Sequence, residues 1–165
     1  MKPALLVVDI QNAWLGNSPE LKASVEKRMD VMNEAISWFR KSGYPIVVIS
    51  HEDLKRSVTP GTDAFEFTQA VQIEEDDVRV TKHYPNSFNK TGLESILREK
   101  GCDTVLIVGL SASGCALATC LGAEDYDFRS MLVKGGVASH DENHVRFAEE
   151  ICETIGLDEF DVKLR

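Results

Sequence analysis

The chain has 165 residues, of which 43% are hydrophobic and 27% are charged, a composition typical of one globular domain. Its formal net charge of −9 disfavours binding to nucleic acid through a basic face and binding to anionic membrane surfaces. The 4 cysteines include no CxxC pair, and no apolar run is long enough for a membrane span. We therefore expect a single domain over residues 1–165 of a cytoplasmic protein with reduced thiols and with no nucleic-acid or membrane partner.

Short apolar runs bounded by polar residues recur along the chain and predict strands that are buried in a sheet. In chain order, the predicted strands cover residues 4–8, 46–49, 78–80, 104–108, 131–133 and 160–164. The least regular stretch, residues 52–77, contains the turn Pro60-Gly61, and we expect it to form a long loop over a site.

Helix signals lie between the predicted strands. Ser18 and Pro19 predict the N-cap and the first position of a long amphipathic helix that Gly43 closes. Three further helices are predicted from N-terminal caps or capping boxes at Thr91, Ser113 and Ser139. Because strands and helices alternate, the sequence predicts a single-domain three-layer α/β/α fold with a mainly parallel six-stranded sheet.

Three chemically active side chains fall just beyond predicted strands. Asp9 follows the first strand, Lys82 follows the third, and Cys115 stands near the start of the helix after the fourth. Ligands of parallel sheets bind beyond the carboxyl ends of the strands, so an acid, a base and a thiol gather at one edge. Taken alone, each has an ordinary interpretation, namely a solvated strand end, a surface lysine or a small buried hydrophobe.

The combination of the three residues is more informative than any one of them. A helix N-terminus and a nearby ammonium both favour the thiolate, which predicts a lowered pKa for Cys115. The carboxylate of Asp9 can accept the thiol proton and later activate water. The turn before Cys115 can aim backbone N–H groups at a developing oxyanion. The residues therefore favour nucleophilic catalysis by a cysteine.

An ordered set of segments around these residues matches a known family. The matching pieces are residues 9–12, Lys82, residues 87–88, Thr91, Leu93, residues 108–115, Thr119 and residues 137–139. With these pieces in this order, the chain resembles the isochorismatase-like cysteine hydrolases, the superfamily that includes the nicotinamidases. The resemblance covers nearly the whole chain.

The resemblance implies a catalytic triad of Asp9, Lys82 and Cys115 that hydrolyses an amide or similar C–N bond of a small molecule. Cys115 attacks the carbonyl as Asp9 accepts its proton, the amine leaves, and a thioester remains on Cys115. Asp9 then activates water, which hydrolyses the thioester and releases the acid. It also implies a cis peptide bond between Leu110 and Ser111, and an oxyanion hole made by the backbone N–H groups of Ser111 and Cys115. Because members of the family usually assemble, we expect a homo-oligomer, a dimer or larger.

The sequence departs from the family pattern at the place where nicotinamidases bind a metal. Glu52 falls near the position of the metal-binding Asp, and Leu54 occupies the place of the first His. We therefore expect no metal and no other cofactor. Ala112 and Ala116 are smaller than the usual residues beside the nucleophile, which alters the pocket. The presence of Cys115 argues against isochorismate as the substrate.

Several further assignments are open at this point. Gln11, Trp14 and Phe88 flank the predicted site and are candidate substrate contacts. His140 and His144 stand at helical spacing, but without a third ligand nearby they do not predict a zinc site. Two alternatives to a hydrolase remain, a non-catalytic binding or scaffold protein of the same fold and a thiol redox protein, although no resolving cysteine is marked.

Overall fold

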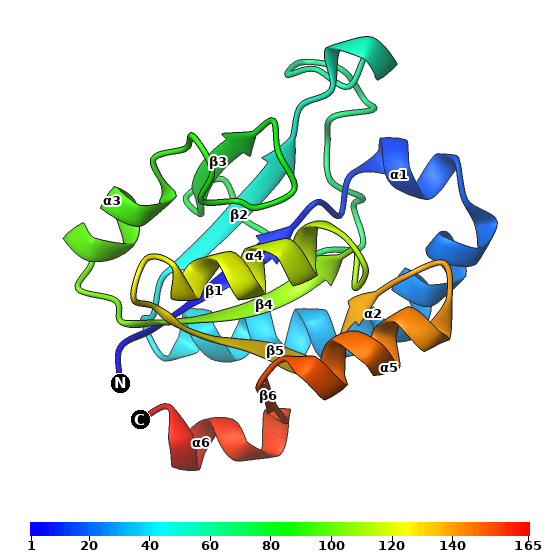
Figure 1. Cartoon of the computed structure of the whole chain (residues 1–165). Helices are drawn as coiled ribbons and strands as arrows, with labels where there is room; N and C mark the ends of the chain where they lie inside the picture. The colour runs from blue at the N-terminus through cyan, green and yellow to red at the C-terminus, as the bar shows by residue number, and fades with distance from the viewer.

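The computed structural model describes all residues from 1 to 165. Its centre is a six-stranded sheet in the order β3-β2-β1-β4-β5-β6, and every pairing is parallel (Figure 1). The strands are β1 (Pro3–Val8), β2 (Ile46–His51), β3 (Val78–Lys82), β4 (Thr104–Leu110), β5 (Arg129–Ala138) and β6 (Thr154–Ile155). The predicted α/β fold with a six-stranded parallel sheet is therefore confirmed.

The two central strands account for the most apolar runs of the sequence. All 6 residues of β1 and all 7 of β4 are buried, because helices cover both faces of the sheet. The two strands pair along their length, from Pro3 opposite Thr104 to Val8 opposite Gly109. Their carboxyl ends therefore reach the same edge of the sheet.

Helices on both faces of the sheet complete the three layers (Figure 1). The helices are α1 (Asn12–Gly16), α2 (Pro19–Lys41), α3 (Leu93–Glu99), α4 (Cys115–Glu124), α5 (Glu142–Ile151) and α6 (Phe160–Lys163). Side chains of α3, α4 and α5 form one apolar core with the sheet, and those of α2 and α6 form a second core on the opposite face. None of the helices combines the length and apolar character that crossing a membrane requires.

The long helix α2 begins and ends where the sequence predicts. The hydroxyl oxygen of Ser18 accepts a hydrogen bond from the backbone N–H of Leu21 at 3.1 Å, and Pro19 is the first helical residue. The helix ends at Lys41, and Gly43 then adopts a φ of 72°, which a glycine adopts without strain.

The last predicted strand is wrong, because residues 160–164 form helix α6 and its end. Phe160 and Leu164 are fully buried four residues apart, whereas Val162 between them is 83% exposed. That pattern has the period of a helix and not the alternation of a strand. The sixth strand is instead the two-residue β6, which pairs with Leu132 and Val133 of β5.

Three predicted helix caps lie one or two residues before the observed N-cap positions. The N-cap positions of α3, α4 and α5 belong to Gly92, Gly114 and Asp141. The hydroxyl of Thr91 donates to the carbonyl oxygen of Ser87 at 2.6 Å, and its oxygen accepts from the N–H of Leu93, the first residue of α3, at 3.3 Å. Asp141 caps α5 by accepting from the N–H of Asn143 at 2.8 Å. Each helix therefore begins later than its polar signal suggests.

The irregular stretch over residues 52–77 is a long loop, as predicted. Its one short 3-10 helix covers Leu54–Arg56, and the loop then runs back along α1 (Figure 1). The carbonyl oxygens of Ala64 and Glu66 accept hydrogen bonds from the N–H groups of Ala13 and Asn12 at 3.0 and 2.8 Å. These bonds fix the loop beside the carboxyl edge of the sheet.

Candidate active site

Three separate elements bring Asp9, Lys82 and Cys115 together at the carboxyl edge of the sheet. Asp9 directly follows β1, Lys82 is the last residue of β3, and Cys115 is the first residue of α4. Because β2 lies between β1 and β3, the lysine side chain must extend across a strand to meet Asp9. The structure therefore unites the three residues that the sequence singled out.

The ammonium of Lys82 is the centre of this cluster and is fully buried. Its Nζ lies 2.9 Å from Asp9 Oδ2 and 2.9 Å from His51 Nδ1. It also lies 3.1 Å from Cys115 Sγ and 3.2 Å from the carbonyl oxygen of Tyr84. An ammonium has three hydrogens to donate and accepts none, so the four atoms are acceptors that share these three hydrogens. The buried charge is both paired and hydrogen-bonded, as burial of a charge requires.

Asp9 has one occupied and one free carboxylate oxygen. Oδ2 binds Lys82, whereas Oδ1 is buried and has no hydrogen-bond partner. Burial raises the pKa of this carboxyl above its usual value, and the positive charge of Lys82 opposes that rise. Its backbone has a φ of 55°, unusual for a residue other than glycine. Asp9 thus combines a raised proton affinity with a free acceptor oxygen.

The thiol of Cys115 does not have the lowered pKa that the sequence predicts. Burial and the negative charge of Asp9 raise its pKa to about 12, and the ammonium of Lys82 offsets this in part. The sequence-based prediction took account of the Lys82 cation and the helix N-terminus. It did not take account of the buried carboxylate of Asp9, whose negative charge disfavours the thiolate. In the resting site the sulfur therefore carries its proton.

The turn that leads to Cys115 contains backbone N–H groups that have no acceptor within the chain. The peptide bond between Leu110 and Ser111 is cis, as the family resemblance implies. The N–H groups of Ser111 and Cys115 donate to no acceptor within the chain, whereas those of Gly114 and Ala116 both donate to the Ser111 carbonyl oxygen. The turn therefore offers unpaired donors, among them the N–H group of the nucleophile itself.

The end of β4 approaches β1 too closely for any side chain. Gly109 has a φ of 119°, and a Cβ atom there would lie 2.1 Å from the carbonyl oxygen of Val8. This glycine allows the turn that carries Cys115 to start directly beside the end of β1. The nucleophile and the carboxylate of Asp9 therefore reach the same pocket.

Helix α4 is also fixed to the loop that follows Lys82. The hydroxyl oxygen of Thr119 accepts from the N–H of Ser87 at 3.0 Å and lies 2.8 Å from its hydroxyl. Gly122 leaves room for the side chain of Asn86, whose amide nitrogen would lie 2.1 Å from a Cβ atom there. Helix α4, which carries the thiol, is thus joined at Thr119 to the loop that follows the ammonium of Lys82.

Gln11 is fully buried and serves as a bridge between segments, so the structure does not place it as a substrate contact. Its amide nitrogen donates to the carbonyl oxygens of His51 and Phe65 at 3.1 and 3.0 Å. Its amide oxygen accepts from the N–H of His51 at 2.8 Å and from the indole N–H of Trp14 at 3.1 Å. The side chain satisfies four groups from three segments and so fixes their positions.

His51 is the site residue that sequence reasoning missed. It is the last residue of β2 and lies directly opposite Lys82 in the register of β2 and β3. Its Nδ1 lies 3.8 Å from Cys115 Sγ and 4.0 Å from Asp9 Oδ2. The sequence could have identified His51, because the position at a strand end that selects Asp9 and Lys82 also selects the last residue of β2.

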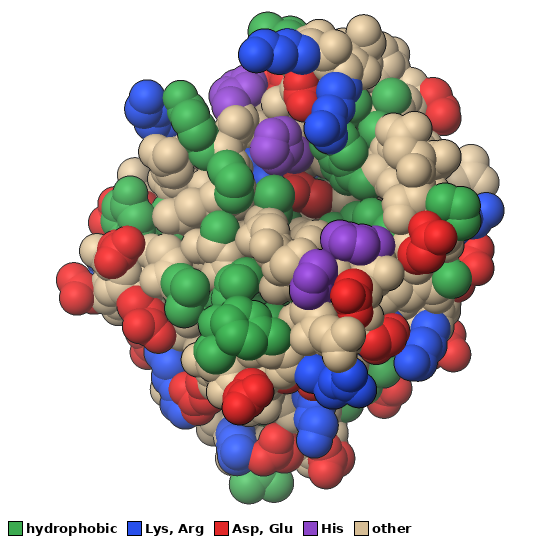
Figure 2. All heavy atoms as spheres, turned by 45° about the vertical axis from the view of Figure 1, so that its right-hand side comes forward, with side chains coloured by type: hydrophobic (Ala, Val, Ile, Leu, Met, Phe, Trp, Pro, Cys, Tyr) green, Lys and Arg blue, Asp and Glu red, His purple; other side chains and the backbone are tan.

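A pocket of about 270 Å³ opens beside the cluster. Its lining residues are Asp9, Trp14, Leu21, His51, Asp53, Arg56, Leu110, Ser111 and Cys115. Figure 2 shows a hollow on this side of the molecule, with acidic atoms inside it and histidine and basic side chains near its rim. The volume suits a small molecule.

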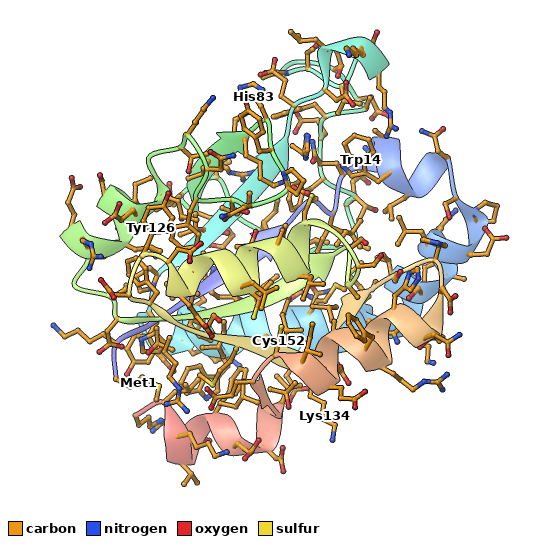
Figure 3. The ribbon with its side chains drawn as sticks, viewed as in Figure 1. Met1, Trp14, His83, Tyr126, Lys134 and Cys152 are labelled. Atoms are coloured by element: carbon orange, nitrogen blue, oxygen red, sulfur yellow. The ribbon has the colours of Figure 1, made fainter.

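The other two candidate contacts differ in position. Trp14 extends from α1 toward the loop after β2 at this edge of the molecule, and it lines the pocket (Figure 3). Phe88 is 3% exposed and stacks on Tyr126 with a ring separation of 5.1 Å. The structure therefore keeps Trp14 as a candidate contact and places Phe88 in the core.

The donor atoms at the site do not fit a metal ion while Lys82 is in place. Asp9, His51 and Cys115 each offer one ligand atom, and these atoms lie within 4.8 Å of one another. The ammonium of Lys82 already fills the space that an ion bound to these atoms would need, since metal–ligand distances are about 2.0–2.3 Å. Leu54, in the place of a family metal ligand, is 74% exposed and has no donor atom.

Comparison with known proteins identifies the family. The family model described as "Isochorismatase domain" matches residues 3–155. The chain therefore belongs to the isochorismatase family, and the resemblance inferred from the sequence is confirmed. A Bacillus subtilis protein described as the uncharacterized isochorismatase family protein YddQ is 29% identical over 142 residues, which are 84% of this chain and 79% of that protein.

Two similar proteins have names that state an activity. Maleamate amidohydrolase of Pseudomonas putida is 31% identical over 90 residues, which are 54% of this chain and 42% of that protein. The crystal structure of N-carbamoylsarcosine amidase from Thermoplasma acidophilum is 29% identical with a TM-score of 0.80, covering 96% of this chain and 98% of that one. Together with the family match, they place the chain among the hydrolases of this family.

Proposed function

We propose that this protein is a metal-independent cysteine hydrolase that cleaves an amide or similar C–N bond of a small molecule through a thioester on Cys115. The observation that carries the proposal is the buried ammonium of Lys82, which joins the Asp9 carboxylate to the Cys115 thiol beside the pocket. One positive charge balances one negative charge, and that negative charge can reside on either oxygen or sulfur. A proton can therefore pass from Cys115 to Asp9 without changing the net charge of the site.

In the first half of the reaction, Cys115 attacks the substrate carbonyl carbon. The S–H proton moves to Asp9, whose raised pKa suits it to accept a proton from a thiol. The S–C bond forms, and the carbonyl oxygen becomes an oxyanion that the free N–H groups of Ser111 and Cys115 can receive. The C–N bond then breaks, the Asp9 proton passes to the leaving nitrogen, and a thioester remains.

In the second half, water replaces the amine. Asp9, again a carboxylate, removes a proton from water as the oxygen attacks the thioester carbon. The C–S bond breaks, the carboxylic acid product leaves, and the proton on Asp9 returns to the sulfur. Lys82 keeps its charge throughout and stabilises whichever of the two groups is anionic.

The proposal is tested by mass spectrometry and by rate measurements on a panel of small amides. We expect an acyl adduct on Cys115 within the first turnovers, and steady hydrolysis that a chelator does not change. Cys115→Ala should abolish both. Loss of activity on chelation with recovery on adding zinc would contradict the metal-independent mechanism, and turnover without any adduct on Cys115 would contradict the thioester.

The two alternatives predict different results in the same experiments. A scaffold protein would leave every amide intact and Cys115 unacylated. A thiol redox protein would consume peroxide and would need a second thiol, yet the side-chain partners of Cys115 are Lys82 and His51. The other three cysteines are buried within or beside the apolar core. The geometry therefore favours the hydrolase.

A further inference from the structure

The reaction proposed above assigns no role to the imidazole of His51. Its Nδ1 lies 2.9 Å from the Lys82 ammonium, and its ring lines the pocket. The side chain is 19% exposed, in contrast to the fully buried Lys82. His51 therefore has one side toward the catalytic cluster and another toward the space where a substrate would sit.

The contact with Lys82 determines which nitrogen of His51 carries the proton. An ammonium can only donate, so Nδ1 must accept with its lone pair and carries no hydrogen. Burial and the charge of Lys82 both lower the pKa of His51, which keeps the ring neutral at physiological pH. The single ring proton is therefore on Nε2.

The Nε2–H group has no partner within the protein. Every hydrogen bond and ion pair of the His51 ring involves Nδ1, toward Lys82, Cys115 and Asp9. Nε2 is also not among the buried polar atoms that lack a hydrogen bond. It follows that this donor is accessible and unused, on a ring that lines the pocket.

The ring is held in this orientation from two sides. Gln11 binds both the backbone N–H and the carbonyl oxygen of His51, at 2.8 and 3.1 Å. The indole ring of Trp14 meets the imidazole edge to face, with ring centroids 6.0 Å apart and an interplanar angle of 77°. A fixed donor of this kind can discriminate between substrates, because its geometry does not adapt to a misplaced acceptor.

We propose that His51 is a specificity-determining residue, whose Nε2–H donates a hydrogen bond to an acceptor in the acyl part of the substrate. This inference rests on the proposed function, because it assigns a role in binding the amide that Cys115 attacks. The chemical class follows from it. Preferred substrates are small amides whose acyl group carries a second acceptor, such as a ring nitrogen, a carboxylate or a carbonyl oxygen.

Pairs of amides that differ only in the acceptor test the proposal. Pyrazinamide and benzamide are one such pair, and succinamate and 4-methylpentanamide are another. We expect the wild-type enzyme to prefer the acceptor-bearing member of at least one pair by about tenfold in kcat/KM, the worth of one such hydrogen bond. In His51→Leu this ratio should fall to about one.

The ratio of kcat/KM within a pair of amides separates the effect of the Nε2–H group from the effect of the contact with Lys82. His51→Leu also removes the acceptor of Lys82, but that loss slows both members of a pair equally and cancels. His51→Gln, whose amide nitrogen can replace Nε2, should retain most of the preference, whereas His51→Asn should lose it. His83→Leu is the matched control, because His83 is exposed, contacts Glu52 and does not touch Lys82. A wild-type ratio near one in both pairs, or an unchanged ratio in His51→Leu, overturns the proposal.

A spectroscopic measurement on the wild-type protein does not depend on hydrolysis or on the folding of a variant. Long-range proton–nitrogen NMR spectra of the labelled protein should show the His51 proton on Nε2. Addition of pyrazinoate should shift the Nε2 resonance, and addition of benzoate should not. A proton on Nδ1, or equal shifts with both acids, overturns the inference. Absence of an acyl adduct on Cys115 would instead overturn the proposed function.

Discussion

The two ends of the pocket are built differently. At the inner end, the catalytic cluster of Asp9, Lys82 and Cys115 is joined by contacts of 2.9 and 3.1 Å around a fully buried ammonium. At the outer end, the pocket mouth of Trp14, Asp53 and Arg56 is open, and the Arg56 side chain is 69% exposed. Arg56 Nε lies 3.6 Å from Asp53 Oδ2, and the guanidinium carbon of Arg56 lies 5.9 Å from the centroid of the Trp14 ring.

This difference separates the type of reaction from the choice of substrate. Separating Lys82 from Asp9 would leave a buried charge unpaired, so this pair is held in place, and that end of the pocket determines the chemistry. Exposed ion pairs contribute little to stability, so the groups of the mouth can change position or identity at small cost. Substitutions at the two ends should therefore differ in their effects as much as the contacts differ.

The largest effect is expected from Cys115→Ala. Loss of the nucleophile should lower kcat by about 10⁴-fold or more, with the fold intact by circular dichroism. Cys120→Ala, on the same helix but facing the core, is the control and should keep nearly full activity while losing some stability. Comparable activity in both variants would show that the thiol of Cys115 is not the reacting group.

The next largest effect is expected from Lys82→Met, which leaves the buried Asp9 without its cation. At neutral pH we expect a loss of about 3–5 kcal/mol in the free energy of unfolding, together with loss of activity. Burial raises the pKa of Asp9, and removing the ammonium raises it further, so the folded variant holds a proton that the unfolded chain releases. The loss of stability should therefore grow as the pH rises from 5 to 8.

Urea denaturation at the two pH values measures this difference. Lys134→Met serves as the matched control, because Lys134 is exposed on β5 and its loss should change stability little at either pH. An equal loss for Lys82→Met at pH 5 and pH 8 would mean that Asp9 does not become the unpaired group.

An intermediate effect is expected from Gln11→Leu, because the Gln11 side chain connects the two ends of the pocket. The substitution leaves the N–H and carbonyl groups of His51 and the indole N–H of Trp14 without partners. We expect a loss of about 1–3 kcal/mol in the free energy of unfolding and a raised KM. Asn12→Ala, which removes a more exposed contact with Asp63, should change both far less. An unchanged KM would show that substrate binding does not depend on this bridge.

The smallest effect on the chemistry is expected from Trp14→Ala at the mouth. KM should rise by about tenfold because an aromatic contact is lost, while kcat changes little, and Trp14→Phe should fall between. The rate at which iodoacetamide alkylates Cys115 should stay within about twofold of wild type, because the catalytic cluster is untouched. A large fall in kcat or in alkylation would mean that the two ends are not separable.

Most of the fold and the catalytic cluster could be predicted from the sequence. Buried parallel strands are continuous apolar runs, and the carboxyl ends of such strands are where functional side chains gather, so Asp9 and Lys82 stood out. Cys115 stood out for the same reason, as the thiol at the start of the helix after the fourth strand. The resemblance to a family added the cis peptide bond and the oxyanion-hole roles of the Ser111 and Cys115 N–H groups. The last strand could not be identified, because the alternation over residues 160–164 also contains two apolar residues at helical spacing.

The roles of the polar residues around the cluster could not be predicted in the same way. Gln11 stands just after a strand end, where ligand-binding residues often occur. Its burial depends on His51, Trp14 and Phe65, which come close to it only through tertiary packing. The raised pKa of Cys115 likewise depends on how deeply the thiol and Asp9 are buried, which no spacing in the sequence reveals. The expected homo-oligomer stays a prediction.

The order of strands in the sheet also decides when the thiol acquires its chemistry during folding. The carboxylate arrives with β1, the sulfur with the helix after β4, and the ammonium with β3 at the far edge of the sheet. Parallel neighbours pair only through long crossovers, so these contacts close later than local helical ones. A nascent chain that lacks α4 has no reacting thiol, and one that has not yet docked β3 has no cation beside it. The catalytic cluster is therefore complete only when β1, β3 and α4 have all docked.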